Sequence, residues 1–269
     1  MRRYAARCLA TIGMLLWCAP APAEEDGPGR GVARISLIQG DISLRRGDSG
    51  DLVAAAVNAP VVVQDAILTS AASRTEIQFD YANMLRLGPN SEIRLSELEY
   101  KRYQIQLARG TTTFRVLREQ DAEVEISTPN VSVRPVKRGV YRVTVRDDGT
   151  SEITVRSGEA EIFTPRGTER LRSGHTMLAR GTAADPEFQI VNAAHEDDWD
   201  NWNRKRDRDL ERSDSYRYVS HDIYGAEDLD NHGHWADVPP YGMVWVPRVA
   251  SGWAPYRYGR WAWIDWYGW

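Results

Sequence analysis

The histidines are the first residues in this chain whose chemistry suggests a site. Of the five histidines, His232 and His234 stand two positions apart, so a strand would place both imidazoles on one face. A carboxylate from Asp222 or Asp230 would complete a zinc or copper site. The spacing is loose, and histidines beside a turn glycine are usually ordinary surface residues. We therefore expect no metal and no cofactor.

Clustered carboxylates are the second candidate chemistry. Glu196-Asp197-Asp198 and Asp228-Leu229-Asp230 are the tightest groups, and paired acids hydrolyse glycosidic bonds when they are held a few ångströms apart. Neither group falls in a predicted rigid strand pair, which favours a solvated charged surface. The sequence also has no Gly-x-Ser-x-Gly elbow, no phosphate-binding glycine loop and no EF-hand pattern. We expect a non-catalytic protein, with a metal-dependent hydrolase as the least favoured alternative.

Aromatic rings near the C-terminus are the third candidate. The chain has ten tryptophans, and nine of them lie at or after Trp199. Tryptophan and tyrosine rings stack on sugars and anchor protein interfaces. The same rings would serve equally well as the core of a small β-module that is poor in Leu and Ile, and the sequence leaves both interpretations open. The candidate ligand or partner contacts are Trp245, Trp253, Tyr256, Trp261 and Trp263.

The first residues are typical of a secretory signal. Basic residues precede an apolar stretch over residues 8–18, and Ala21-Pro22-Ala23 stands before a run of acids. The apolar stretch is shorter than the roughly 20 residues that cross a bilayer, which predicts cleavage after Ala23. Acylation at Cys18 is disfavoured because the bulky Trp17 precedes it. We expect an exported protein that works outside the cytoplasm, with no membrane span after cleavage.

Both cysteines of the chain lie inside this predicted signal, so the mature protein would have no disulfide and no thiol. The 34 basic and 38 acidic residues give a net charge of -4 with both signs scattered along the chain. This balance argues against nucleic acid as a partner. After a linker at residues 24–31, a packed core must supply the stability.

Residues 32–182 show the alternation of apolar and polar residues that is typical of β-strands. Tyr141, Val143 and Val145 alternate with polar residues, for example, and turn sequences such as Gly88-Pro89-Asn90 and Asp147-Asp148-Gly149 separate the runs. This pattern predicts a mainly β fold, an antiparallel sandwich or a jelly-roll relative.

Two further units are predicted after this β domain. Residues 193–215 are densely charged, with tryptophans spaced as on one helical face, and we expect a short amphipathic helix that docks through its tryptophans. Residues 216–269 form a Trp/Tyr-rich tail with an internal repeat at an offset of 26 residues, which predicts small aromatic β-hairpins. Gly233-His234-Trp235 recurs as Gly259-Arg260-Trp261, and Tyr241-Gly242 recurs as Tyr267-Gly268. The second copy stops at Trp269, so we expect a fragment, or a unit completed by a partner or a second copy of the chain.

Several short motifs then follow one another in a recognisable order. They are Ala66-Ile67-Leu68-Thr69-Ser70-Ala71, Glu76-Ile77-Gln78-Phe79, Met84-Leu85-Arg86-Leu87-Gly88-Pro89-Asn90, Leu107-Ala108-Arg109-Gly110, Ser127-Thr128-Pro129, Gly139-Val140-Tyr141-Arg142-Val143 and Val155-Arg156-Ser157-Gly158-Glu159-Ala160. In this order they resemble the FecR domain over residues 32–180, with Val140 where the family often has Thr. The tail is similar to a Trp/Tyr-rich tail behind FecR domains in bacterial envelope proteins, which has no assigned activity.

The resemblance implies a periplasmic β-domain that, in the founding iron-uptake regulators, relays an outer-membrane signal to a sigma factor. Those regulators place a cytoplasmic segment and a membrane helix ahead of the domain, where this chain has a signal peptide. We therefore expect a non-catalytic extracytoplasmic binding or sensing protein of the envelope, which recognises an envelope protein or another ligand. The alternative is a structural module that binds cell-wall polysaccharide, or self-associates, through the aromatic tail.

Overall fold

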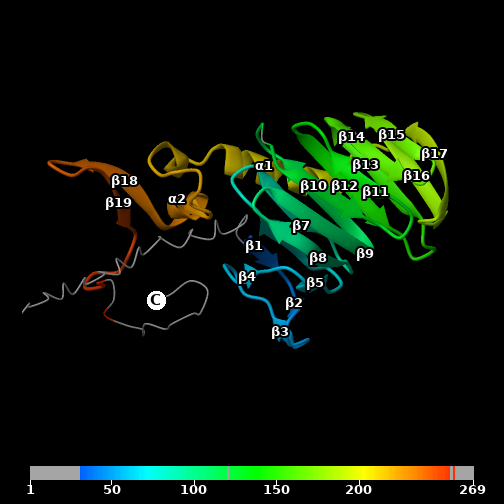
Figure 1. The fold of residues 1–269 in the computed structure, drawn as a ribbon. Helices are drawn as coiled ribbons and strands as arrows, with labels where there is room; N and C mark the ends of the chain where they lie inside the picture. Colours follow the sequence, from blue (N-terminus) through cyan, green and yellow to red (C-terminus); the bar gives the residue numbers. More distant parts are fainter. Residues whose placement is uncertain (1–30, 120, 255–256, 258–269) are drawn as a thin grey trace, which may run out of the picture.

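The computed structural model describes residues 31–119, 121–254 and 257, and the fold is mainly β, as the sequence predicts (Figure 1). A large sheet, a 14-residue helix, and a tail of short helical segments with a two-stranded hairpin follow one another along the chain. The strands of the large sheet are β1 Ala33–Gln39, β2 Ile42–Arg45, β3 Leu52–Ala54, β4 Pro60–Val61, β5 Ala66–Thr69, β6 Arg74–Gln78, β7 Asn83–Leu87, β8 Glu92–Glu99, β9 Arg102–Val116, β10 Glu123–Ser127, β11 Ser132–Pro135, β12 Gly139–Val145, β13 Ser151–Ser157, β14 Glu159–Thr164, β15 Gly167–Arg172, β16 His175–Thr182 and β17 Asp185–Asn192. Strand pairing thus continues through β17, past the predicted boundary at residue 182.

The large sheet consists of two ladders that share strand β9. Ladder A runs β3-β2-β5-β8-β9-β10-β11-β14-β15. Ladder B runs β4-β1-β6-β7-β9-β12-β13-β16-β17. The first half of β9 pairs in ladder A, and its second half, from Gly110, pairs in ladder B.

Strand β9 bends at Gly110, where φ is +86°. A straight strand of this length would separate its ends by about 46 Å, yet β10 begins at Glu123, beside Arg102 at the start of β9. The chain from Val116 to Glu123 reaches at most about 25 Å. The two halves of β9 must therefore fold back on each other, which brings the two ladders together.

The same return explains why β9 and β10 run parallel. The expectation of a purely antiparallel sheet is wrong at this one pair. Because β9 turns back on itself, the short link that follows it ends near its beginning, and β10 sets off in the same direction as β9.

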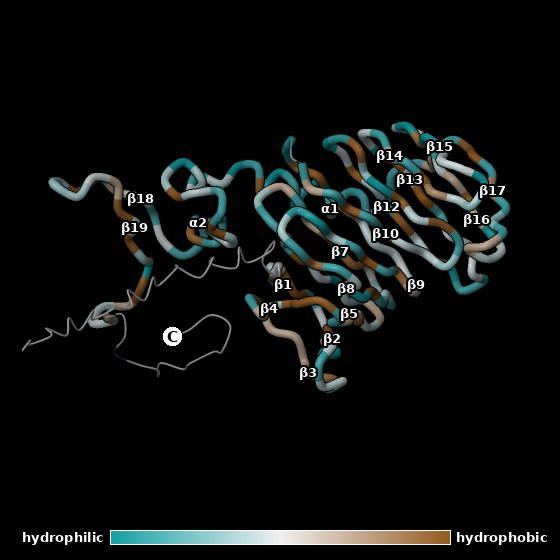
Figure 2. The backbone as a smooth tube through the Cα atoms, in the orientation of Figure 1, coloured by the Kyte–Doolittle hydropathy of each residue, from teal (hydrophilic) through white to brown (hydrophobic). Residues whose placement is uncertain are grey.

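Apolar side chains from both ladders form one core. In β12, Tyr141, Val143 and Val145 are buried while the residues between them are half-buried, which confirms the predicted alternation. Ile105 of ladder A and Ile153 of ladder B belong to the same cluster and are fully buried. Figure 2 shows hydrophobic and hydrophilic residues alternating along these strands. Each such buried side chain contributes about 1.5–3 kcal/mol of transfer free energy.

Helix α1, Asp198–Glu211, confirms the predicted helix. It begins with a capping box, in which the Asp197 side chain accepts from the Asp200 backbone N–H and the Asp200 side chain accepts from the Asp197 backbone N–H. Such reciprocal caps fix where a helix starts. In the described part of the chain, no helix is long and apolar enough to cross a membrane.

The tail forms a small module beside the edge of ladder B (Figure 1). Its elements are two 3-10 helices, η1 Ser215–Arg217 and η2 Ala226–Asp228, then α2 Leu229–His232 and the hairpin of β18 Gly233–Val238 with β19 Gly242–Pro247. The first copy of the sequence repeat is thus a hairpin, as predicted, whereas the second copy lies outside the described residues. Arg34 of β1 forms ion pairs with Glu227 (2.7 Å) and Asp228 (2.8 Å), which connect the module to the sheet.

Candidate functional site

The two outer faces of the large sheet differ, because α1 covers the outer face of ladder B. Asp200 forms ion pairs with Arg142 (3.1 Å) and Arg156 (2.7 Å), and Asp207 forms one with Arg115 (2.7 Å). These partners lie on β12, β13 and β9. The buried residues of the helix include Asp200, Asn203 and Asp207. The helix is therefore docked mainly by buried charge.

Tryptophan has a smaller part in this docking than the sequence predicts. Trp199 donates a hydrogen bond from Nε1 to Thr113 Oγ1 (2.8 Å), and its ring stacks on Trp202 at 5.1 Å between centroids. Both rings are half-buried. Leu210 is the apolar contact of the helix, and it packs with Met84 and Leu117. The predicted helical face is thus correct, but its middle is polar.

Glu76 is the centre of this interface. Its carboxylate is fully buried and accepts from Arg86 Nε (2.7 Å), Arg206 Nη2 (2.8 Å) and Ser36 Oγ (2.7 Å). Burial alone would raise the pKa of Glu76, but the two guanidinium groups outweigh it and lower the pKa to about 2. A carboxylate so fully bonded stabilises the fold and has no capacity left for a ligand.

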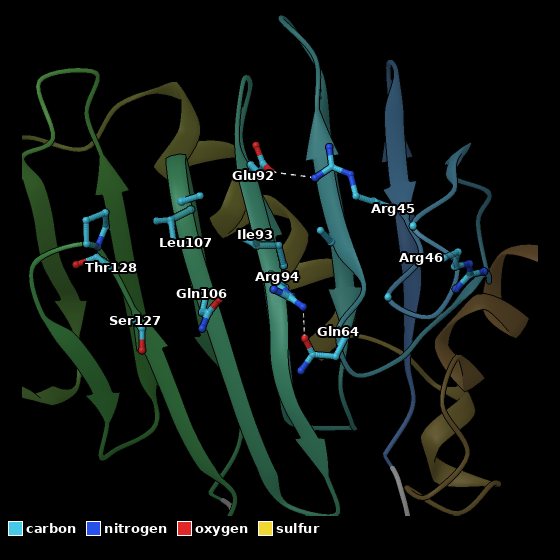
Figure 3. Close-up of a pocket in the computed structure, with 15 residues that line it drawn as sticks. Arg45, Arg46, Gln64, Glu92, Ile93, Arg94, Gln106, Leu107, Ser127 and Thr128 are labelled. Carbon is cyan, nitrogen blue, oxygen red and sulfur yellow. Dashed lines mark hydrogen bonds and ion pairs between the residues drawn. The ribbon is translucent and has the colours of Figure 1, made fainter. Parts of the chain in front are cut away.

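Among the described residues, no helix covers the outer face of ladder A, which contains a groove of about 620 Å³. Figure 3 shows the groove crossing several strands of the ladder. Strands and connecting loops on this face supply its walls. The lining residues are Arg45, Arg46, Gly47, Gly50, Gln64, Ala66, Glu92, Ile93, Arg94, Gln106, Leu107, Ala108, Ser127, Thr128 and Pro129.

Strand register places five of these residues in one row across the ladder. Arg45 pairs with Ala66, Ala66 with Arg94, Arg94 with Gln106, and Gln106 with Ser127. Residues paired in this way point to the same face of a sheet. Two arginines therefore flank the methyl group of Ala66, and an amide and a hydroxyl continue the row.

The arginines of the groove differ in how they are neutralised. Arg46 is bound to the buried carboxylate of Asp65 at 2.9 Å, and Arg45 lies 3.7 Å from Glu92. Arg94 donates to the Gln64 side-chain oxygen (Figure 3), and none of the described carboxylates forms an ion pair with it. The groove thus offers guanidinium donors to an anionic group.

The groove shows no catalytic constellation. Its lining includes no histidine, cysteine or lysine among the residues described. The hydroxyl of Ser127 lies 3.0 Å from that of Ser132, which cannot act as a general base. The arrangement is suited to binding.

The aromatic candidates divide into packed and exposed rings. Trp245 donates from Nε1 to the Leu229 carbonyl (3.1 Å) and packs against Gly233, where an added Cβ would lie 2.5 Å from the ring. It supports the tail module. Trp253 is 47% exposed. Tyr256, Trp261 and Trp263 lie outside the described residues, as does the predicted cleavage site at Ala23.

The histidine pair does not lie on one strand, so the weak candidate metal site considered in the sequence is not formed in that way. His232 ends α2 and His234 lies on β18, because the helical turn persists to the glycine that starts the strand. Asp230 is already bonded to the backbone N–H of Asp214 and Ser215. Within the described residues, no group of three or more His, Cys, Asp or Glu side chains is arranged to hold a metal ion.

Sequence reasoning missed the groove. Arg94 stands between Ile93 and Leu95 in a strand pattern, which marks an outward-facing charge. Nothing in the pattern shows that Arg45, far earlier in the chain, lies two strands away on the same row. That neighbourhood depends on the register of β2, β5 and β8.

Two family models match parts of the chain. Residues 65–161 match the family described as "FecR protein", so the chain carries a FecR domain. Residues 226–269 match a "Family of unknown function (DUF6600)". No curated protein matches the chain.

Two crystal structures of a "putative anti-sigma factor" from Parabacteroides distasonis ATCC 8503 are similar to part of the chain. The identities are 18% and 17%, and the TM-scores are 0.40 and 0.41. Each alignment covers 47% of this chain and 59% of the solved chain, so the match spans well under two thirds of those proteins.

Proposed function

We propose that this protein is a non-catalytic extracytoplasmic sensing protein of the bacterial envelope, which binds a protein partner on the outer face of ladder A. The FecR domain supports a signalling or sensing role. The predicted signal peptide at residues 1–23 supports a periplasmic or secreted location. The identity of the partner follows from neither.

The observation that carries this proposal is the contrast between the two outer faces. On ladder B the chain uses its own helix to bury charged side chains such as Arg86 and Glu76. On ladder A the same sheet leaves a groove with charged and amide side chains exposed. A charged groove left open in this way is a surface that another molecule can occupy.

Site-specific crosslinking in living cells tests the proposal. The full chain is produced with a photoreactive residue at Gln106, in the groove, and as a matched control at Arg208, on the exposed face of α1. We expect one discrete protein adduct from position 106 and none from position 208. Equal adducts from both positions, or none from position 106, would contradict a partner site on ladder A.

The location is tested on the same material. We expect the protein recovered from the periplasmic or medium fraction to begin at Glu24, as read by intact mass. Retention of residues 1–23 would instead indicate a membrane-tethered sensor.

A second candidate function is binding to cell-wall polysaccharide through the tail. It is favoured by three exposed side chains of the tail module, Tyr241 (79%), Met243 (40%) and Trp253 (47%), since exposed rings stack on sugars. Retention on peptidoglycan that is lost in a Trp253→Ala, Trp261→Ala variant would support it. Unchanged retention, or none in the wild type, would remove it.

A further inference from the structure

Arg45 and Arg94 stand on one row of ladder A with only Ala66 between them. Neighbouring strands are about 4.8 Å apart, so the two arginine backbones are roughly 10 Å apart. Ala66 reaches only as far as its methyl group, which leaves space between the two long side chains. The row therefore forms a notch with a guanidinium on each side.

We propose that this groove binds an extended acidic peptide segment of a protein partner, with one carboxylate at Arg45 and another at Arg94. This inference rests on the proposed function and names the chemistry of the partner. Arginine pairs with carboxylates through directed hydrogen bonds, which fix position as well as charge.

The charge of the groove agrees with such a partner. Its lining contains three arginines and one glutamate. The Glu92 carboxylate lies 3.7 Å from Arg45 and 3.2 Å from Arg109, so its charge is shared between two exposed guanidinium groups. Arg94 donates to the amide oxygen of Gln64 and keeps further donors for an incoming carboxylate.

The other lining groups favour a peptide over a polysaccharide. Sugar sites stack their ligand on aromatic rings, and none of the described lining residues is aromatic. Gln64 and Gln106 offer both a donor and an acceptor, which is what a peptide backbone requires. Ala66 and Ala108 have short side chains, so the backbone of an extended chain can approach the sheet there.

The spacing also indicates the pattern of the peptide. In an extended peptide, alternate side chains point to the same side and are about 7 Å apart. The backbones of Arg45 and Arg94 are roughly 10 Å apart. The long, flexible side chains of arginine and glutamate make up the difference between these two spacings. With both arginine side chains extended outward from the sheet, a single carboxylate does not reach both guanidinium groups. Acidic residues two positions apart suit the notch.

Fluorescence anisotropy on the full mature chain tests this inference. The probe is a labelled ten-residue peptide of alternating Glu and Gly, and the comparison probe has Gln in place of Glu. We expect Arg94→Gln and Arg45→Gln each to weaken binding of the Glu probe about two- to fivefold, as for exposed ion pairs. Arg170→Gln, on the far strand of the same face, is the matched control and should leave binding unchanged.

A fourth variant should act in the opposite direction. Glu92→Gln removes the carboxylate that competes for Arg45, and we expect it to tighten binding of the Glu probe about two- to fivefold at low salt. Damage to the fold could weaken binding, but it would not tighten it. Circular dichroism checks that the variants, all at exposed or half-buried positions, remain folded.

The inference and the proposed function fail in different ways. If Gln106 gives its crosslink but the Glu probe does not bind, or binds no better than the Gln probe, the partner site stands and the acidic peptide is wrong. Equal affinity of Arg94→Gln and Arg170→Gln for the Glu probe would also overturn the inference. Polygalacturonate is titrated in parallel, and binding of that polymer with none of the peptide would assign the groove to an anionic glycan instead.

Discussion

Replacement of Glu76 by glutamine would show how much the buried charges beneath α1 stabilise the fold. The glutamine keeps the size of the side chain and can still accept from Ser36, but Arg86 and Arg206 lose the charge of Glu76, and Arg86 keeps its ion pair with Asp207 (2.7 Å). Arg86 is fully buried and cannot turn to water. We expect a loss of about 3–5 kcal/mol in the free energy of unfolding at pH 7, the usual cost of removing one member of a buried pair.

The pKa of Glu76 gives a second, independent figure. It is lowered from 4.5 to about 2, and each unit of difference corresponds to about 1.4 kcal/mol, so the charge contributes about 3 kcal/mol. Because the pKa is lower in the folded state, this stability is present above pH 4.5 and is lost as the pH falls toward 2. The difference between wild type and Glu76→Gln should therefore shrink to about 1 kcal/mol at pH 3.

Urea unfolding at pH 7, 5 and 3, followed by circular dichroism and tryptophan fluorescence, measures this difference. Other acids titrate in both proteins, so their contributions cancel in the comparison. Glu152→Gln is the control, because its pair with Arg146 is largely exposed and should be worth less than about 1 kcal/mol. A difference for Glu76→Gln below about 1 kcal/mol at pH 7, or one that stays constant down to pH 3, would refute the reasoning.

Three further changes test other parts of the structure. Asp200→Ala removes the ion pairs of Asp200 with Arg142 on β12 and Arg156 on β13, and half of the capping box of α1. We expect faster exchange of the amide hydrogens throughout α1. Unchanged exchange rates there would contradict the docking. Gly110→Ala would place a Cβ 2.4 Å from Ser91 Oγ at a φ of +86°, and we expect it to lower the free energy of unfolding in urea by more than about 3 kcal/mol. The control is Gly149→Ala, which has a φ of +78° but open space around it and should lower the free energy of unfolding by about 1 kcal/mol. Equal losses would show that β9 does not need its bend. Arg34→Ala breaks the connection between sheet and tail, so limited proteolysis should cut within residues 213–235 sooner while the sheet stays intact, and an unchanged cleavage rate would mean that other contacts hold the tail.

Much of the fold follows from local patterns. The alternation of Tyr141, Val143 and Val145 identifies an inward face, and the structure buries those residues as the pattern requires. The pattern cannot show that β9 belongs to both ladders, because the close approach of Ser91 to Gly110, which leaves no room for a side chain at the bend, is a tertiary contact. The parallel pairing of β9 with β10 follows from that bend.

Helix α1 shows more clearly what cannot be predicted from the sequence alone. The sequence predicts the helix and its docking through tryptophans, whereas the structure docks it mainly through buried charge. The sequence does not show that Asp200 and Asp207 are buried, because their arginine partners lie on distant strands. The strand pattern likewise predicts that Arg86 points away from the core. The structure agrees with this direction, but α1 buries the side chain completely.

By itself, the sequence determined the alternating strands, the helix and the hairpin, because each depends on residues within a few positions of one another. The tertiary structure alone decided which charges are buried and which are exposed. Arg86 and Arg94 lie on adjacent segments of the same sheet with similar apolar neighbours. Arg86 is buried beneath α1 and Arg94 lines an open groove, because in the described part of the chain α1 lies on ladder B and no helix covers ladder A.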